Sequence, residues 1–240
     1  MKHDIVYLLK TDIDSDELKY SIRSVVQNFP YRKIVFVGGK PDDIDPDIYL
    51  PDDQPGSTKW QKSTHSLKLA CKCDDLTDDV WLFNDDFFVM DKVKVDVNYF
   101  GGTLEKRIRD LRRLHPGGST YIRSLELMRA NLARTGCDTL DFCLHLPMLV
   151  NRQKVLKLFK DRPDCVMFRS FYGNVYEIDC QYSKDCKVYD LESIPDTPYI
   201  STTDVSYRDG KIGEFLRQYF DTPSKYEKQE RRKEDDKSDL

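Results

Sequence analysis

Residues 80–90 read VWLFNDDFFVM, an apolar and aromatic run that two adjacent carboxylates interrupt. A run of this kind is typical of a buried β-strand. Burying an unpaired carboxylate is costly, by several kcal/mol. We therefore expect Asp85 and Asp86 to lie at the carboxyl end of the strand, where they face a cleft and a cation.

The segments before this run predict a βαβ unit. Residues 4–9 (DIVYLL) and 33–37 (KIVFV) are near-continuous apolar runs, as expected of parallel strands that are covered on both faces. Between them, Asp14 and Glu17 have the spacing of a capping box, and apolar residues recur at helical intervals up to Pro30. A right-handed crossover brings both strand ends to one edge, where open α/β sheets bind ligands.

The next segments predict a loop and a helix that opens with a basic residue. Residues 41–56 are rich in Pro and Asp, which indicates a surface loop. The string Gly56-Ser57-Thr58-Lys59 then begins a helix. Free amides at a helix start together with the charge of Lys59 predict a phosphate site, although an ordinary cap with a solvated lysine explains the pattern about as well.

Composition and charge describe a globular protein with an uneven charge distribution. The 240 residues carry a net charge of −4, and 39% of them are hydrophobic. Residues 98–136 reverse the sign, with eight Lys or Arg against three acids, and glycines and prolines divide this part into two helices. Such a basic insertion could hold an anionic acceptor, such as nucleic acid or a phosphate-rich glycopolymer, or simply form a solvated helix face.

The expected compartment follows from the lack of a membrane-spanning run and of a signal-peptide pattern in the sequence. No apolar run approaches the roughly 20 residues that a membrane span needs, and the N-terminal residues have no signal-peptide pattern. We therefore expect a cytoplasmic protein without a membrane span. Seven cysteines at irregular spacings are expected to be mostly reduced structural thiols.

Three later stretches carry residues suited to ligand binding. Residues 141–150 resemble a strand with His145 inside it, which is either a core residue or a further ligand of a cation. Arg169, Tyr172 and Asn174 combine a fixed cation with an aromatic and an amide, which could stack a sugar or base and hold a phosphate. Residues 200–206 form a hydroxyl-rich loop around one acid, and a last amphipathic helix follows.

The carboxylate pair also carries a resemblance to a known family. Asn84-Asp85-Asp86 at the end of an apolar strand resembles the Asp-x-Asp element of GT-A glycosyltransferases. The resemblance implies that the last aspartate binds a divalent cation, manganese or magnesium, which holds the diphosphate of a nucleotide sugar such as a UDP-sugar. Asn84 departs from the first aspartate of that element, so its role stays open.

Further blocks extend the likeness. Residues 16–25, 82–88 and 145–147 resemble the ordered blocks of the Stealth family of hexose-1-phosphate transferases. The chain is more similar, over most of residues 4–226, to small glycosyltransferase-like proteins of bacteriophages and prophages. The blocks that carry this likeness are Gly56 to Lys59, Asn84 to Phe88, His145 to Pro147, Tyr172 to Asn174 and Ser201 to Asp204.

The resemblance implies a fold and a plan of the chain. We expect an α/β fold, a GT-A-like, Rossmann-type mixed sheet flanked by helices, with a helical insertion. A single catalytic domain over residues 1–224 would comprise a nucleotide-binding half (1–97), the basic insertion (98–136) and an acceptor or closing half (137–224). Residues 225–240 are densely charged and should form a frayed helix or stay disordered.

If the protein is phage-encoded, the expected cytoplasm would be that of the bacterial host. The resemblance also implies roles for single residues. The metal ligands would be Asp85, Asp86 and His145, and the diphosphate would contact Lys59, Arg169 and Lys211. Lys10 and Gly39 would lie near the nucleoside. Asp204 would hold sugar hydroxyls or act as the base. A cation and basic side chains offset the charge of the leaving diphosphate without proton transfer.

Several alternatives stay open at this point. A Stealth-like transferase that moves a sugar 1-phosphate would use the same carboxylates, and a noncatalytic interaction protein could keep them as a calcium or structural site. The sequence does not choose between inversion and retention at the sugar, or name the sugar and nucleotide. Modified bases of phage DNA and cell-wall polymers are both reasonable acceptors.

Overall fold

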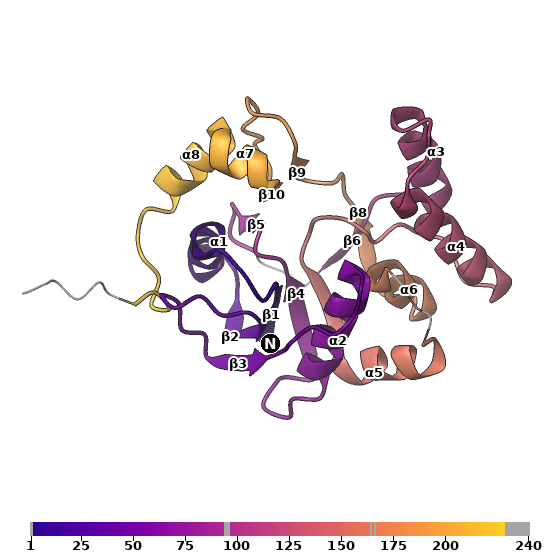
Figure 1. Ribbon diagram of the computed structural model, residues 1–240, viewed down its shortest axis with the longest axis horizontal. Helices are drawn as coiled ribbons and strands as arrows, with labels where there is room; N and C mark the ends of the chain where they lie inside the picture. Colours follow the sequence, from indigo (N-terminus) through magenta and orange to yellow (C-terminus); the bar gives the residue numbers. More distant parts are fainter. Residues whose placement is uncertain (1, 94–96, 164, 166, 229–240) are drawn as a thin grey trace, which may run out of the picture.

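The fold is built on a five-stranded mixed sheet. The computed structural model describes residues 2–93, 97–163, 165 and 167–228 (Figure 1). The strands lie in the order β3 (Ile48–Pro51), β2 (Tyr31–Gly38), β1 (His3–Leu9), β4 (Asp79–Phe83) and β7 (Met148–Asn151). The first four run parallel, and β7 pairs antiparallel with β4. The predicted mixed α/β architecture is confirmed.

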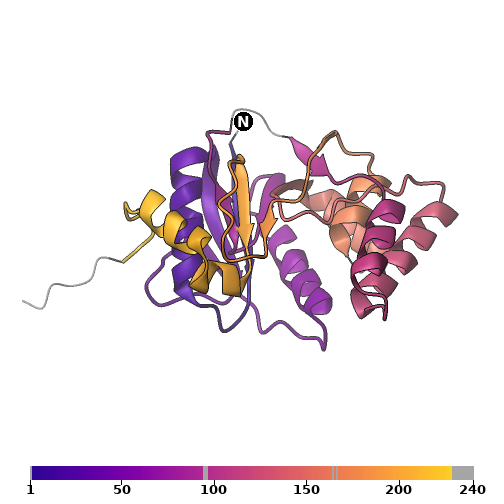
Figure 2. The ribbon, with the colours of Figure 1, turned by 90° about the horizontal axis from the view of Figure 1, so that it is seen from above.

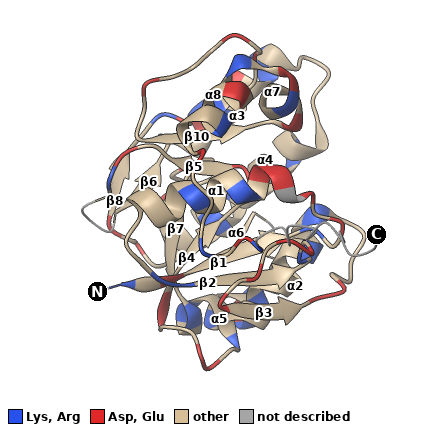
Figure 3. Ribbon diagram, turned by 90° about the vertical axis from the view of Figure 1, so that its left-hand side faces the viewer, with Lys and Arg blue, Asp and Glu red and all other residues tan. Residues whose placement is uncertain are grey.

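Helices cover both faces of this sheet because strand side chains alternate between the faces. From β1, Ile5, Tyr7 and Leu9 pack in one core with Leu18 and Ile22 of α1 (Ser15–Asn28). The opposite face packs in a second core that includes side chains of α2 (Lys59–Cys71) and α5 (Arg152–Asp161). The ribbons of β1 and β2 are accordingly mostly uncharged, whereas charged residues lie in the helices and loops around them (Figure 3).

Two groups of elements flank the sheet on opposite sides. A small sheet of β5 (Phe87–Val89), β10 (Tyr199–Thr202) and β9 (Lys187–Val188) carries α7 (Asp204–Asp209) and α8 (Lys211–Tyr219). On the other side lie the paired strands β6 (Asn98–Phe100) and β8 (Cys180–Tyr182), with α3 (Leu104–Leu114), α4 (Thr120–Arg134) and α6 (Phe168–Val175). Both views show α7 and α8 far from α3 and α4 (Figures 1 and 2).

The secondary structure differs from the sequence predictions in the later part of the chain and in one loop. Residues 41–56 contain the edge strand β3, and of the strand expected over 141–150 only residues 148–150 are extended, as part of β7. The stretch expected to bind a ligand, residues 169–174, is helical. A β-carbon on Gly173 would lie 2.5 Å from the ring of Phe142, so glycine allows close packing of this helix.

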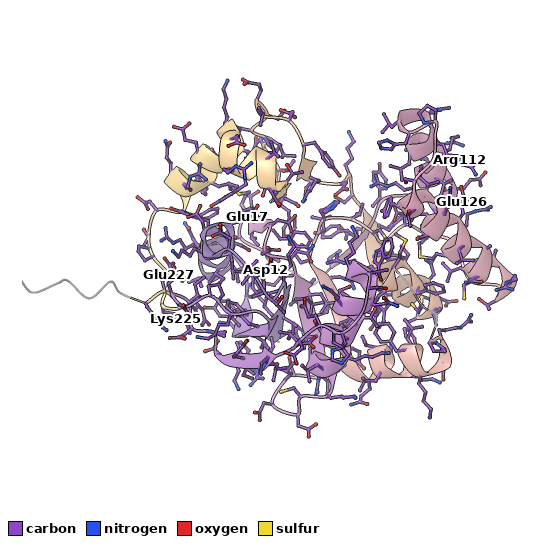
Figure 4. All side chains as sticks on the ribbon, viewed as in Figure 1. Asp12, Glu17, Arg112, Glu126, Lys225 and Glu227 are labelled. Carbon is purple, nitrogen blue, oxygen red and sulfur yellow. The ribbon has the colours of Figure 1, made fainter. Side chains whose placement is uncertain are left out.

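The start of the charged tail is packed, contrary to expectation. Tyr226 is 4% exposed and donates to Asp47 at 2.7 Å, and Glu227 forms a two-point ion pair with Arg23 of α1. Figure 4 labels Glu227 beside the main body. The predicted frayed or disordered segment therefore does not begin at Lys225, and residues 229–240 lie outside the described residues.

Two further expectations can be compared with the structure. All seven cysteines are free thiols, as predicted. Within the described residues, no helix combines the length and the apolar character needed to cross a bilayer.

Candidate active site

A cavity lies where the strand order reverses. Successive strands run outward from β1 to β2 and β3, but β4 lies on the other side of β1, so the reversal falls between β1 and β4. In open α/β sheets, ligands bind at the carboxyl ends of the strands beside such a reversal. The first cavity, of about 260 Å³, is lined there by Leu8 of β1, by Leu82 and Phe83 of β4, and by the adjoining Asn84.

The walls of the first cavity come from distant segments. Trp60, Ser63 and Thr64 of α2 form one side, and Tyr121 of α4 lines another. α2 begins where it does because Thr58 and Gln61 form a capping box. The sequence prediction for this helix start is confirmed in position.

His145 lies in the first cavity and is oriented by a carboxylate. Its Nδ1 atom lies 2.9 Å from Oδ2 of Asp185, and its backbone N–H donates to Oδ1 of the same residue at 3.0 Å. Burial alone would raise the pKa of Asp185, but the hydrogen bonds from His145 and the nearby Arg107 lower it overall. An imidazole held this way through Nδ1 has its second nitrogen free for proton transfer.

Arg169 brings a positive charge to the same cavity. Its Nη1 atom donates to the carbonyls of Leu144 and Leu146, and its guanidinium lies 5.6 Å from the ring centre of Phe87. No ion pair joins this side chain to a carboxylate within the described part of the chain. Burial lowers the pKa of Arg169, which means that its charge is incompletely compensated. Such a cation can receive an anionic ligand.

The two aspartates face different surroundings. The carboxylate of Asp86 accepts hydrogen bonds from Lys187 of β9 and, at 2.9 Å, from Ser201 of β10. The side chains of Asp86 and Lys187 are 14% and 13% exposed. Asp85 instead lines a second cavity of about 380 Å³. Both carboxylates thus lie just beyond the end of β4, as predicted, but they do not face one common cleft.

The second cavity is acidic and contains two of the other predicted residues. Lys10 and Asp204 line it together with Asp85 and Glu17. Burial, followed by the charge of Asp86, raises the pKa of Asp85 to about 6. Burial likewise raises the pKa of Glu17 to about 8, although a hydrogen bond from Thr202 opposes this shift. Glu17 turns to Thr202 and does not complete the predicted capping box with Asp14, which caps Asp16.

Several predicted contact residues are not brought into either cavity. Tyr172 is 2% exposed and its hydroxyl accepts from the backbone of Asn151, while Asn174 bonds the backbone of Leu140. Lys211 pairs with Glu192 on the surface. These three side chains have structural partners, and α6 lines the first cavity with Phe168 and Arg169 instead.

Two other predicted residues, Gly39 and Lys59, line neither cavity. A β-carbon on Gly39 would lie 2.1 Å from the carbonyl oxygen of Lys10, so glycine allows the ends of β1 and β2 to touch. Lys59 is exposed at the start of α2, with its ammonium 5.6 Å from the ring centre of Trp60. Direct contact of either residue with a ligand stays a prediction.

The side chains do not form the predicted metal site. The described residues contain no group of three His, Cys, Asp or Glu side chains placed to share an ion. Asp86 holds the ammonium of Lys187, Asp85 faces the second cavity, and His145 is bonded to Asp185. Magnesium and manganese are commonly held by one or two free carboxylates together with waters and substrate phosphates. The donor set around Asp86 therefore does not fit a divalent cation.

Sequence reasoning missed the residues that hold this site together. Lys187 and Asp185 belong to a segment without a strong pattern, and β9 is only two residues long. Glu17 was read as a helix cap because its spacing from Asp14 fits that role. The available signal was the pair Ser201 and Thr202. Adjacent strand residues point to opposite faces, so the two hydroxyls can bond different partners, here Asp86 and Glu17.

The comparisons with known proteins concern the fold. No protein-family model and no curated protein sequence matches the chain, so the Stealth and phage likenesses gain no support and stay predictions. The solved structure of the galactosyltransferase LgtC, in complex with donor and acceptor sugar analogs, is similar with a TM-score of 0.52 and 12% identity, and the match covers 92% of this chain and 96% of LgtC. The glycosyltransferase GlyE from Streptococcus pneumoniae TIGR4 matches with a TM-score of 0.45 and 11% identity, over 92% of this chain and 60% of GlyE. The likeness to LgtC, together with the central mixed sheet, shows that the chain has a GT-A-type glycosyltransferase fold.

Proposed function

We propose that the protein is a glycosyltransferase that moves a sugar from a nucleotide-diphosphate sugar to an acceptor hydroxyl. The observation that carries this proposal is the first cavity, which lies at the strand-order reversal and combines the oriented His145 with the incompletely compensated Arg169. A cation can stabilise the leaving diphosphate, and a proton acceptor can activate the attacking hydroxyl in a transfer with inversion at the sugar. The GT-A-type fold supports the same reaction class.

The donor would bind with its diphosphate toward Arg169. The cavity volume of about 260 Å³ lies just below the roughly 300–1,000 Å³ of small-molecule pockets. It therefore suits the reacting sugar and the phosphates, with the nucleoside, for example uridine, extending over the strand ends near Lys10 and Gly39. Asn84 lines the cavity and can hydrogen-bond the sugar, which gives this departure from the Asp-x-Asp pattern a role.

His145 would act as the base for the acceptor. The acceptor hydroxyl oxygen bonds to the sugar's anomeric carbon while the bond from that carbon to the diphosphate oxygen breaks. The hydroxyl proton passes to Nε2 of His145, and the bonding electrons leave with the diphosphate. Arg169 stabilises the charge that develops there. Asp185 stabilises the imidazolium, in the way that a carboxylate assists a catalytic histidine. We prefer His145 to Asp204 because Asp204 lines the other cavity.

The positive charge beside Asp86 would come from Lys187. Manganese or magnesium was expected here, but the ammonium already occupies the carboxylate that would have to bind the ion. We therefore assign no step to a metal. Arg169 lines the first cavity, and the charge of Asp86, whose carboxylate holds Lys187, acts on its guanidinium.

A thermal-shift panel tests the function. Nucleotide-diphosphate sugars should raise the melting temperature, because a ligand that binds the native state stabilises it. Release of nucleoside diphosphate in the presence of a sugar acceptor should follow, both with chelator and with manganese. The proposal is wrong if no nucleotide sugar shifts the melting temperature of the wild type and if nucleoside diphosphates, with or without manganese, do not bind either. Nucleoside monophosphate as the product would instead indicate sugar-phosphate transfer.

A further inference from the structure

A basic hollow, separate from the first and second cavities, lies between α3 and α4. Its volume is about 510 Å³, and we call it the arginine groove. It is lined by Arg109, Arg112 and Arg113 of α3, by Arg129 of α4, and by the acids Glu105 and Glu126. Four positive charges thus face two negative ones. Figure 4 labels Arg112 and Glu126, which lie side by side at the edge of the molecule that is formed by these helices.

The helix geometry explains why the arginines gather in one place. On α3, residues 109, 112 and 113 are spaced at i, i+3 and i+4, which puts their side chains on neighbouring positions of the helix surface. Like charges at these spacings destabilise a helix by a few tenths of a kcal/mol per pair. The fold therefore keeps a charge cluster that weakens its own helix slightly, unless an anion offsets the repulsion.

The charges of the groove are only partly compensated. Arg112 donates to Glu126 at 2.6 Å, and Arg113 lies 3.7 Å from Asp110. Neither Arg109 nor Arg129 has a carboxylate within the 4.0 Å of an ion pair among the described residues. Guanidinium groups bind phosphate through two parallel hydrogen bonds, and partly exposed arginines remain free to do so.

The groove is connected to the candidate active site by the helices that form it. Tyr121, the second residue of α4, lines the first cavity, and Arg129 lies eight residues further on, which corresponds to about 12 Å along the helix axis. On α3, Arg107 lies two residues before Arg109 and therefore on the other side of the helix, 4.0 Å from Asp185, the partner of His145. A ligand held in the groove must therefore extend around these helices, over a path longer than the spacing along α4, to reach the first cavity.

We propose that the arginine groove binds a phosphate group carried by the acceptor saccharide. This proposal deepens the proposed glycosyl transfer and rests on it. The groove holds the phosphate while a hydroxyl further along the saccharide lies at His145. Glu105 and Glu126 interrupt the positive surface, so the groove suits a single phosphate group better than the continuous phosphate track of a nucleic acid. The net charge of residues 98–136 is +5, against −4 for the whole chain, which steers an anionic acceptor to this side.

Binding of maltotriose 6-phosphate, measured by calorimetry without any donor, tests the groove. Arg109→Ala combined with Arg129→Ala should weaken binding at least tenfold, because the phosphate loses two charged hydrogen-bond donors. Arg123→Ala combined with Arg134→Ala removes the same charge from α4 outside the groove and should change binding less than about twofold. Unphosphorylated maltotriose should bind far more weakly than the phosphate ester.

Each other outcome has a definite meaning. Equal losses in the two double variants would show a diffuse charge effect and overturn the proposal, as would tight binding of unphosphorylated maltotriose. A short DNA duplex that binds more tightly than the saccharide, and depends on the same two arginines, would identify a nucleic-acid partner and overturn the saccharide assignment. If the groove binds as expected while no nucleotide sugar binds the wild type, the phosphate site stands and the glycosyl-transfer function fails.

Discussion

Replacing Glu17 with glutamine should change how the stability of the protein depends on pH. Glu17 extends from α1, where its Oε1 accepts a hydrogen bond from Thr202 of β10. Burial, together with Asp86 and Asp85, raises its pKa from 4.5 to about 8. Glutamine has the same shape, accepts the same hydrogen bond and carries no charge, so the change isolates the effect of ionisation. Figure 4 labels Glu17 between α1 and the strands that close over it.

The magnitude follows from proton linkage. Glutamic acid in the unfolded chain loses its proton near pH 4.5, whereas the folded protein keeps the Glu17 proton up to about pH 8. Between these values the native state binds one more proton, so its free energy of unfolding falls by about 1.4 kcal/mol for each pH unit of increase. Relative to Glu17→Gln, the wild type should lose roughly 2.5 kcal/mol between pH 5 and pH 7.

Urea unfolding of both proteins at pH 5, 6 and 7 measures this difference, because titration of all other groups largely cancels between them. The stability advantage of the variant should grow with each step in pH. A difference that stays constant within about 0.5 kcal/mol would show that Glu17 ionises normally, and the assignment of a neutral carboxyl beside Asp85 would be wrong. Thr202→Val serves as a control that removes the hydrogen bond and keeps the carboxyl.

Three further predictions concern the candidate active site. His145→Gln should lower kcat by roughly 10²–10⁴ while circular dichroism stays unchanged, and Asp185→Asn should lower kcat less. Arg169→Ala should raise the Kd for nucleotide sugar about tenfold or more, with Arg169→Lys recovering part of the loss in titration calorimetry; no change would remove Arg169 from the donor site. Lys187→Ala leaves Asp86 without its ammonium partner and should destabilise the protein by about 3 kcal/mol in urea, a loss that a well-hydrated pair would not show.

The parts of the fold that follow from local patterns could be predicted from the sequence. The apolar runs over residues 4–9 and 33–37 form β1 and β2, and the acids after residue 83 lie beyond the end of β4. These features depend on strand burial and on the cost of burying a carboxylate, which the local sequence reveals. The edge strand β3 escaped prediction because its Pro- and Asp-rich surroundings resemble a loop.

The arrangement of the site could not be predicted because its contacts are distant in sequence. Lys187 meets Asp86 across 101 residues, and Glu17 meets Thr202 across 185. Lys187 lies in no strong pattern, and a capping role accounted for Glu17 locally.

The distant contacts also explain why the side chains of Asn84, Asp85 and Asp86 face different parts of the protein. Asn84 lines the first cavity and Asp85 the second, so the short turn after β4 divides the two. Asp86 lies in this turn, and its carboxylate is held by β9 and β10 from the last quarter of the chain. Because Glu17 is also bonded to β10, residues 187–202 close over strand ends that belong to the first 90 residues. Neither cavity is therefore complete in one half of the chain. We expect the proposed division into a nucleotide-binding half and an acceptor half to describe ligand contacts but not separately folding units.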